Sequence, residues 1–385
     1  MKKNLLQNKK VAIIGAGPVG LTTARLLQQA NVDVHVYEWD NNAEVRIFGG
    51  TLDIHKNTGQ LALEKAGLLD AFYAAARPTG EHLVGKNGES LMYDFPNEEQ
   101  LYHRPEVDRN DLRQLLLQNL TPDTVVWGKQ LKEIVKIEEH FILRFEDGTE
   151  VYADVVIGAN GSKSKVRQRL TTATPKFTGT IIIQGEVFNP ELNAPNYKAL
   201  CKEDNVMVIA DKTMFASQIK SKGTINYFFC FKAEETFAND ENIDVSESSQ
   251  VADYLKKVCS DWDPKFIELF EATKSFWVLP MRNMPLDEKW QTEDAITLVG
   301  DAAHAMPPFA GVGVNIGLLD ALRLSENLLS DKFDSIREAM EDYEHNMFGY
   351  AGEAQRDTAS AESDFFSDTA IEDHIKGREE WNKTL

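Results

Sequence analysis

The sequence lacks the features that mark several large classes of protein. Its three cysteines, at positions 201, 230 and 259, are widely spaced and form no CxxC pair, so neither disulfides nor a metal site is expected. It has no apolar run of about eighteen residues and no signal-peptide core at its N-terminus. Basic residues are outnumbered, 41 against 61 acidic ones, which gives a net charge of −20. That charge disfavours nucleic acid and anionic membranes as partners. Since neither an apolar segment nor disulfides are expected, we predict a cytoplasmic protein, and we expect it to be a monomer.

The rest of the composition is ordinary for a globular protein, and its patterns predict an α/β fold. The apolar fraction is 42% and the charged fraction 26% of 385 residues, which is enough chain for two domains. Residues 11–38 follow a strand–helix–strand pattern, whereas residues 175–285 are rich in strand-like segments separated by polar turns. A helical pattern runs from residue 317 to about 350. The chain therefore predicts one α/β domain, interrupted by an antiparallel sheet and followed by a helical tail.

A glycine turn near the N-terminus is the first segment that indicates chemistry. Gly15, Gly17 and Gly20 follow an apolar strand and precede a helix. In this spacing the first glycine permits the bend, the second lets the backbone approach a pyrophosphate, and the third lets helix and strand pack closely. Glu38 ends the next strand-like segment, where a carboxylate can accept hydrogen bonds from ribose hydroxyls. A dinucleotide site is therefore predicted, with NAD and FAD both open at this point.

A second glycine turn, nearly three hundred residues later, favours FAD. An apolar segment at residues 296–299 leads into Gly300 and Asp301 and then into a proline- and glycine-rich loop. This string resembles the second FAD fingerprint of the class A flavin monooxygenases, the para-hydroxybenzoate hydroxylase-like family. In that family the aspartate binds the ribityl chain and the loop lies beside the isoalloxazine ring. His304 follows this aspartate and is expected to make local bonds at the helix start.

Two other segments extend the same resemblance. Residues 158–167 are similar to the family's middle motif, with Asn160 where an aspartate is usual. In the family, that position touches both FAD and NADPH. The change from aspartate to asparagine therefore affects the place where the nicotinamide of NADPH is expected. A helix opens at Asp108 and carries Arg109, which matches the family's arginine-bearing helix. The resemblance implies that Arg109 contacts FAD.

Residues 46–55 narrow the resemblance to the tetracycline-inactivating flavin monooxygenases. The matching arginine is implicated in NADPH use in those enzymes, and the matching aspartate contacts FAD; here they are Arg46 and Asp53. Gln184 matches a glutamine that contacts substrate. The substrate half departs from the pattern, since Asn226 and Phe228 stand where that group carries a histidine and a glycine. A few polar groups set the specificity of such a pocket, so a different polycyclic or phenolic substrate is an open alternative.

The resemblance implies a discontinuous Rossmann-like FAD-binding domain with an inserted antiparallel β-sheet substrate domain and a C-terminal helix that bridges them. The ranges expected are 1–75, 101–174 and 286–318 for the FAD-binding domain, 76–100 and 175–285 for the substrate domain, and 319–385 for the bridging region. The predicted cofactor-binding residues are Gly15, Gly17, Pro18, Gly20, Glu38, Arg46, Asp53, Arg109, Asp301, Pro308, Gly311, Gly313, Val314 and Asn315. The predicted substrate-binding residues are Gln184, Asn226, Phe228 and Phe309.

The implied activity is an FAD-dependent monooxygenase that uses NADPH and O2. An aromatic or polycyclic phenol or enol is hydroxylated through a C4a-hydroperoxyflavin, and inactivation of tetracycline antibiotics is one form of that reaction. No residue is assigned as a catalytic acid or base. Two alternatives stay open: a related class A hydroxylase of another phenolic substrate, and a flavin-loaded protein that binds an aromatic ligand without turnover.

Overall fold

A computed structural model describes residues 5–45 and 48–384. A parallel sheet at its N-terminal end has the strand order β17-β11-β1-β2-β7. These strands are β17 (Ile296–Leu298), β11 (Val155–Gly158), β1 (Lys10–Ile14), β2 (Asp33–Tyr37) and β7 (Val125–Val126). Strands that adjoin in space come from distant parts of the chain, so the two glycine turns end at the same edge of the sheet. The expected strand–helix–strand start is confirmed by β1, α1 (Pro18–Gln28) and β2.

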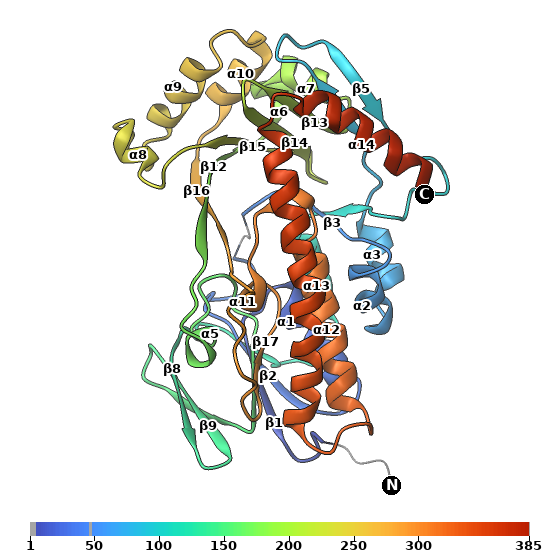
Figure 1. The fold of residues 1–385 in the computed structure, drawn as a ribbon, viewed down its shortest axis with the longest axis vertical. Helices are drawn as coiled ribbons and strands as arrows, with labels where there is room; N and C mark the ends of the chain where they lie inside the picture. The colour runs from blue at the N-terminus through green and yellow to red at the C-terminus, as the bar shows by residue number, and fades with distance from the viewer. Residues whose placement is uncertain (1–4, 46–47, 385) are drawn as a thin grey trace.

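Helices and a small sheet surround this parallel sheet (Figure 1). The helices are α1, α2 (Gly59–Lys65), α3 (Leu69–Ala75), α4 (Arg109–Gln118), α5 (Arg167–Leu170), α11 (Asp301–His304) and α12 (Gly313–Leu329), with a 3-10 turn at Pro308–Ala310. A short ribbon pairs β3 (Leu52–Asp53) with β6 (Glu106–Val107). The small sheet contains β8 (Leu131–Ile137), β9 (His140–Phe145) and β10 (Glu150–Ala153). Strands β9 and β10 pair as a hairpin that turns at Asp147-Gly148.

The second main sheet is large and has the strand order β16-β12-β15-β14-β13-β4-β5. Its strands are β16 (Phe276–Asn283), β12 (Lys176–Val187), β15 (Ile225–Lys232), β14 (Thr213–Ile219), β13 (Asn205–Ala210), β4 (Glu81–Val84) and β5 (Ser90–Asp94). All neighbours are antiparallel except β13 and β4, which pair in parallel. We call this the substrate-side sheet. Strand β14 was not among the strand-like segments recognised in the sequence.

Alternate residues of the substrate-side sheet face two different environments. One set joins an apolar core with α7 (Pro195–Cys201), α9 (Ser248–Val258) and α10 (Pro264–Ala272). The short helices α6 (Pro190–Asn193) and α8 (Phe237–Asp240) lie at the margins of that layer. The other set, which includes Ile182 and Cys230, packs with Phe309 of the 3-10 turn. The second face is therefore turned toward the loop that the sequence predicts beside the flavin.

The C-terminal helices contact both main sheets. The expected single helical pattern is broken, because α12 ends at Leu329 and α13 (Ile336–Phe365) starts after Ser335, whose Oγ accepts from the Glu338 N–H. Tyr343 of α13 donates to the Leu298 carbonyl of β17 at 2.9 Å. Near its other end, Glu362 accepts from Thr178 of β12 and Lys232 of β15, each at 2.9 Å. Helix α13 thus runs alongside both main sheets (Figure 1).

Helix α14 (Ala370–Thr384) folds back over the far edge of the substrate-side sheet. His374 contacts Glu81 of β4 at 2.7 Å, and Arg378 pairs with Asp94 of β5 at 2.5 Å. Ala370, Ile371 and Ile375 pack into the apolar cluster that holds Phe309. Within residues 5–45 and 48–384 no helix is both long and apolar enough to span a bilayer.

Candidate cofactor and substrate site

The first glycine turn is shaped by backbone crowding. Gly15 has φ +111°, and a Cβ there would overlap the Ala159 carbonyl oxygen. A Cβ at Gly20 would overlap the Gly15 carbonyl oxygen, so both positions need glycine for close packing. Gly17 differs, because no atom lies within 4 Å of its Cβ position. It leaves open space directly at the N-terminus of α1, which Pro18 begins.

Glu38 lies beside this turn, at the carboxyl end of β2. Its side chain is 5% exposed, and Oε2 accepts from the Ala16 N–H at 2.5 Å. Oε1 accepts from the Asp40 N–H at 3.1 Å. The carboxylate therefore stands at the predicted ribose position and also holds the backbone of the glycine turn.

The second turn places an exposed acid at the same sheet edge. Gly300 has φ +61°, and Asp301 follows it as the first residue of α11, with its side chain exposed. Burial lowers the pKa of Arg109, and the charge of Asp301 opposes that shift. Arg109 Nε donates to the Gly50 carbonyl at 3.0 Å. Two predicted cofactor residues from distant segments thus interact across one site.

The proline- and glycine-rich loop closes onto Asp53. Gly311 has φ +68°, and a Cβ there would lie 3.5 Å from an Asp53 carboxylate oxygen. Asn315 Nδ2 donates to the Asp53 carbonyl at 2.9 Å, and its Oδ1 accepts from the His55 N–H at 2.7 Å. The Asn315 amide therefore fastens this loop to β3. Gly313 and Val314 begin α12, whose first N–H groups have no partners within the helix.

The middle motif joins the second turn from another side. Asn160 Oδ1 accepts from the Ser164 hydroxyl at 2.5 Å. The buried Arg167 side chain reaches across to α11 and donates to the Ala302 carbonyl at 3.0 Å. Asn160 therefore stabilises its own loop, while Arg167 ties that loop to the turn carrying Asp301.

The predicted substrate residues divide into two groups. Gln184 Nε2 donates to Asn226 Oδ1 at 2.8 Å, and these side chains are 4% and 0% exposed. Phe228 is half-buried and faces Gly50, where a Cβ would lie 3.0 Å from its Cζ. Phe309 packs against Phe365, with ring centroids 6.2 Å apart, in the apolar cluster that Phe228 borders. The two phenyl rings thus border one apolar region, while the two amides bind each other.

A cavity of about 520 Å³ lies beside Pro307 of the proline- and glycine-rich loop. It is bounded by Pro307, by Lys232 and Thr178 of the substrate-side sheet, and by Glu362 and Phe366 near the end of α13. The cavity is thus next to the segment that the sequence predicts beside the isoalloxazine ring. Arg46 lies outside the described residues.

The sequence matches the FAD binding domain family over residues 8–346. The chain belongs to this family. A 6-hydroxynicotinate 3-monooxygenase from Pseudomonas fluorescens is 26% identical over 364 residues, covering 91% of this chain and 90% of that protein. HpxO of Klebsiella pneumoniae, solved with FAD and uric acid, has a TM-score of 0.78 at 20% identity and covers 99% of this chain and 94% of its own. The tetracycline destructase Tet(51) has a TM-score of 0.74 at 19% identity, covering 96% and 94%.

These matches confirm the predicted family, fold class and flavin cofactor. The chain is a homologue of the class A FAD monooxygenases and is assigned at this level to flavin-dependent monooxygenases. The arrangement of residues fits FAD on its own terms. The open space at Gly17 suits a pyrophosphate at a helix N-terminus, and the exposed Asp301 stands at the same sheet edge. The residue roles stay predictions.

His304, in the second FAD fingerprint, is turned away from the site. It is fully buried, and its Nε2 contacts Asp320 Oδ2 of α12 at 2.5 Å. Burial acts to lower the pKa of His304, but the charge and hydrogen bond of Asp320 outweigh it and raise the pKa. Asp320 also accepts from the Gly300 N–H at 2.7 Å and from the Tyr350 hydroxyl at 2.6 Å. The pair therefore fixes the second glycine turn against α12 and α13.

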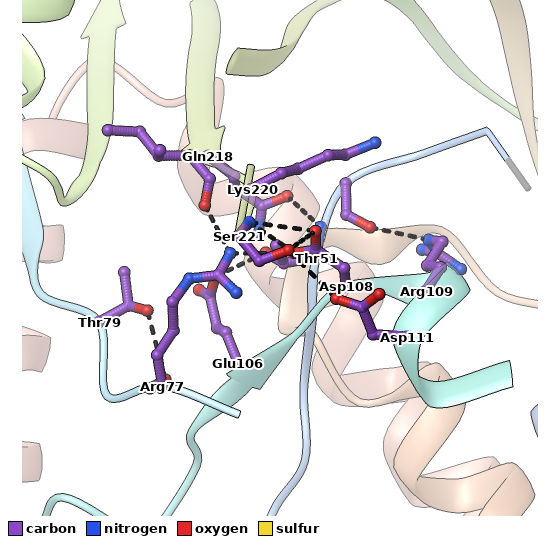
Figure 2. Close-up of polar contacts among 12 residues, drawn as sticks. Thr51, Arg77, Thr79, Glu106, Asp108, Arg109, Asp111, Gln218, Lys220 and Ser221 are labelled. Carbon is purple, nitrogen blue, oxygen red and sulfur yellow. Dashed lines mark hydrogen bonds and ion pairs between the residues drawn. The ribbon is translucent and has the colours of Figure 1, made fainter. Parts of the chain in front are cut away.

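Sequence reasoning missed a polar junction between the FAD-binding domain and the substrate-side sheet (Figure 2). The buried pair Lys220–Glu186 links the end of β14 to β12 at 2.8 Å. Gln218, Glu106 and Asp108 join the two domains directly. The one signal in the sequence is the alternation of polar residues with apolar ones at the end of β14, but Gln218 and Ser221 find their partners Thr51 and Asp108 more than a hundred residues away.

Proposed function

We propose that this protein is an NADPH-dependent FAD monooxygenase that inserts one atom of O2 into an electron-rich aromatic, heteroaromatic or polycyclic phenol or enol. The observation that carries the proposal is convergence. The two glycine turns, Asp53, Arg109 and Asp301 gather at one sheet edge, next to the face of the substrate-side sheet that carries Phe228 and against which Phe309 of the 3-10 turn packs. A cofactor held at that edge would face a surface on which aromatic and apolar side chains lie beside a few amide groups, which suits an aromatic substrate that bears polar groups.

When bound, FAD supplies the redox and oxygen chemistry. The protein's own residues bind, orient and exclude water. The helix N-termini of α1 and α12 offer unpaired N–H groups to negatively charged parts of the cofactor. Phe309, Phe365 and α14 cover the substrate-side face, which keeps water from the reacting region.

The substrates of relatives guide the choice of candidates. One relative is a 6-hydroxynicotinate 3-monooxygenase, HpxO was solved with uric acid, and Tet(51) is a tetracycline destructase. The first two name small hydroxylated or oxidised nitrogen heterocycles, and the third a polycyclic antibiotic. Gln184 donates to Asn226, and the aromatic and apolar side chains on the same sheet face suit the ring of any of these molecules.

A product screen tests the proposal. The FAD-loaded protein is incubated with NADPH and air in separate reactions, each with one candidate substrate: 6-hydroxynicotinate, urate, tetracycline or a simple phenol. We expect substrate-stimulated NADPH oxidation and, in at least one reaction, a product that has gained one oxygen atom from O2, with loss of CO2 where the attacked carbon bears a carboxylate, as C3 of 6-hydroxynicotinate does. A protein that binds these ligands but shows neither effect with any of them would be a ligand-binding flavoprotein, and the monooxygenase proposal would be wrong.

A further inference from the structure

Residues 49–53 form a short segment that touches both domains, and we call it the linking segment. Arg109 of α4 donates to the Gly50 carbonyl at 3.0 Å. The Thr51 N–H donates to Gln218 Oε1 of β14 at 3.1 Å, and the Thr51 hydroxyl contacts Glu106 Oε2 at 2.5 Å. Figure 2 shows Thr51 between Gln218 and Glu106, with Arg109 on its far side. The segment is therefore held from the FAD-binding domain and from the substrate-side sheet at adjacent residues.

Glu106 connects the linking segment to a second strand of that sheet. It is 7% exposed, and its Oε1 accepts from Asn205 Nδ2 of β13 at 2.6 Å. Across the β3–β6 ribbon it pairs with Asp53, the predicted FAD contact. Burial raises the pKa of Glu106, opposed by the hydrogen bond from Thr51. One buried carboxyl thus joins Thr51, Asp53 and the substrate-side sheet.

The contact at Gly50 leaves no free space. A Cβ there would overlap Gln218 Oε1 and would lie 3.0 Å from Phe228 Cζ. Phe228 is a predicted substrate residue, whereas Arg109 on the other side of Gly50 is a predicted cofactor residue. A shift of the linking segment would therefore move both groups relative to each other.

A second set of bonds at the junction does not touch the linking segment. Asp108 Oδ2 accepts from the Ser221 hydroxyl at 2.8 Å and from the Ser221 N–H at 3.1 Å. Arg77 donates to Asp108 Oδ1 at 3.1 Å. These bonds fasten the β14–β15 turn to the start of α4, so they offer a matched control within the same junction.

We propose that Gln218 and Glu106 are positioning residues for the flavin site: they clamp the linking segment to the substrate-side sheet and thereby place Arg109 and Asp53 for FAD. This proposal rests on the proposed function, because it requires FAD to bind at this edge of the parallel sheet. Neither residue needs to touch FAD. Their effect passes through Thr51 and Gly50, and it makes cofactor affinity depend on the sheet that receives the substrate.

The test combines hydrogen exchange with FAD titration. In Gln218→Leu the Thr51 N–H loses its acceptor, whereas Gln218→Glu keeps an oxygen at Oε1. We expect the leucine variant to exchange the amides of the linking segment roughly tenfold faster in the FAD-loaded protein and to bind FAD roughly fivefold more weakly. The glutamate variant should restore both the exchange rate and the FAD affinity. In the leucine variant, weaker FAD binding should be accompanied by a shifted flavin absorbance spectrum.

Glu106→Leu and Glu106→Gln repeat the comparison on the second arm, and Ser221→Ala is the control. Glutamine preserves hydrogen bonds to Thr51 and Asn205, so it should resemble the wild type, and Ser221→Ala should change neither reading. Unchanged exchange and FAD affinity in Gln218→Leu, or equal losses in Ser221→Ala, would overturn the clamp. If the wild type itself bound no FAD, the proposed function would fail, while exchange of the linking segment would still decide whether the clamp exists.

Discussion

The two halves of the site are specified by different kinds of contact. At the FAD edge the decisive groups are backbone atoms, because a Cβ at Gly15 or Gly20 would overlap carbonyl oxygens, whereas no atom lies within 4 Å of the Cβ position at Gly17. On the substrate-side sheet the decisive groups are side chains, such as the Gln184–Asn226 pair and the Phe228 ring. Backbone requirements allow few residue types, whereas side-chain surfaces can change with the substrate. This difference explains why the cofactor half keeps its family pattern and the substrate half does not.

The largest effect is expected where the backbone is most crowded. Gly15→Ala adds a Cβ that overlaps the Ala159 carbonyl at φ +111°. We expect destabilisation by at least about 4 kcal/mol and no FAD binding. Gly17→Ala has open space around it, so it should keep the wild-type melting temperature and lose FAD affinity only. Thermal unfolding and flavin titration of both variants separate the two roles, and equal melting temperatures would contradict the distinction.

The second largest loss of stability is expected at the buried ion pair of His304 and Asp320. Asp320→Asn removes the charge that faces His304 and should cost about 3 kcal/mol of unfolding free energy. Because the pKa of folded His304 is raised above its usual 6.5, the pair's contribution is full below pH 6.5 and is lost as pH rises through the folded value. Urea unfolding across that window should show this decline in the wild type and not in the variant. Tyr350→Phe, which removes one hydrogen bond only, should keep the pH dependence.

On the substrate side the expected effects are smaller. Asn226→Ala leaves the buried Gln184 amide without its acceptor and should cost about 1–3 kcal/mol. Gln184→Ala and the double variant complete a cycle, and we expect the double loss to be less than the sum of the single losses. FAD affinity should stay unchanged throughout. A strong loss of FAD affinity in Asn226→Ala would contradict the division between the two halves of the site.

The smallest change in unfolding free energy is expected at the junction between the FAD edge and the substrate-side sheet. The raised pKa of Glu106 means that the folded state holds its proton more tightly, so the contribution of Glu106 to stability is full below pH 4.5 and is lost as pH rises through the folded value. Glu106→Gln cannot ionise and should therefore gain about 1 kcal/mol on the wild type at neutral pH and little at pH 4. Unfolding free energies at the two pH values test this, and a variant that is less stable at neutral pH would show that the carboxylate is needed as an anion.

Much of the fold followed from local patterns, and the exceptions have physical causes. The strand–helix–strand start and the β9–β10 hairpin depend on neighbours in sequence. Strand β14 was missed because its polar residue Gln218 is satisfied by Thr51, which lies on a distant segment. His304 was expected to make local bonds, but its partner Asp320 lies on the next helix.

The sequence by itself determined the family and the flavin edge, because the glycine spacing is a requirement of the backbone that only a few residues can meet. Tertiary structure alone decided which side chains share the junction. Thr51, Glu106, Asn205 and Gln218 meet only when two sheets pack together, and no local pattern records that register. A hydrogen bond between distant segments depends on where the whole chain places them, and so the clamp that we propose can be recognised only in the folded molecule.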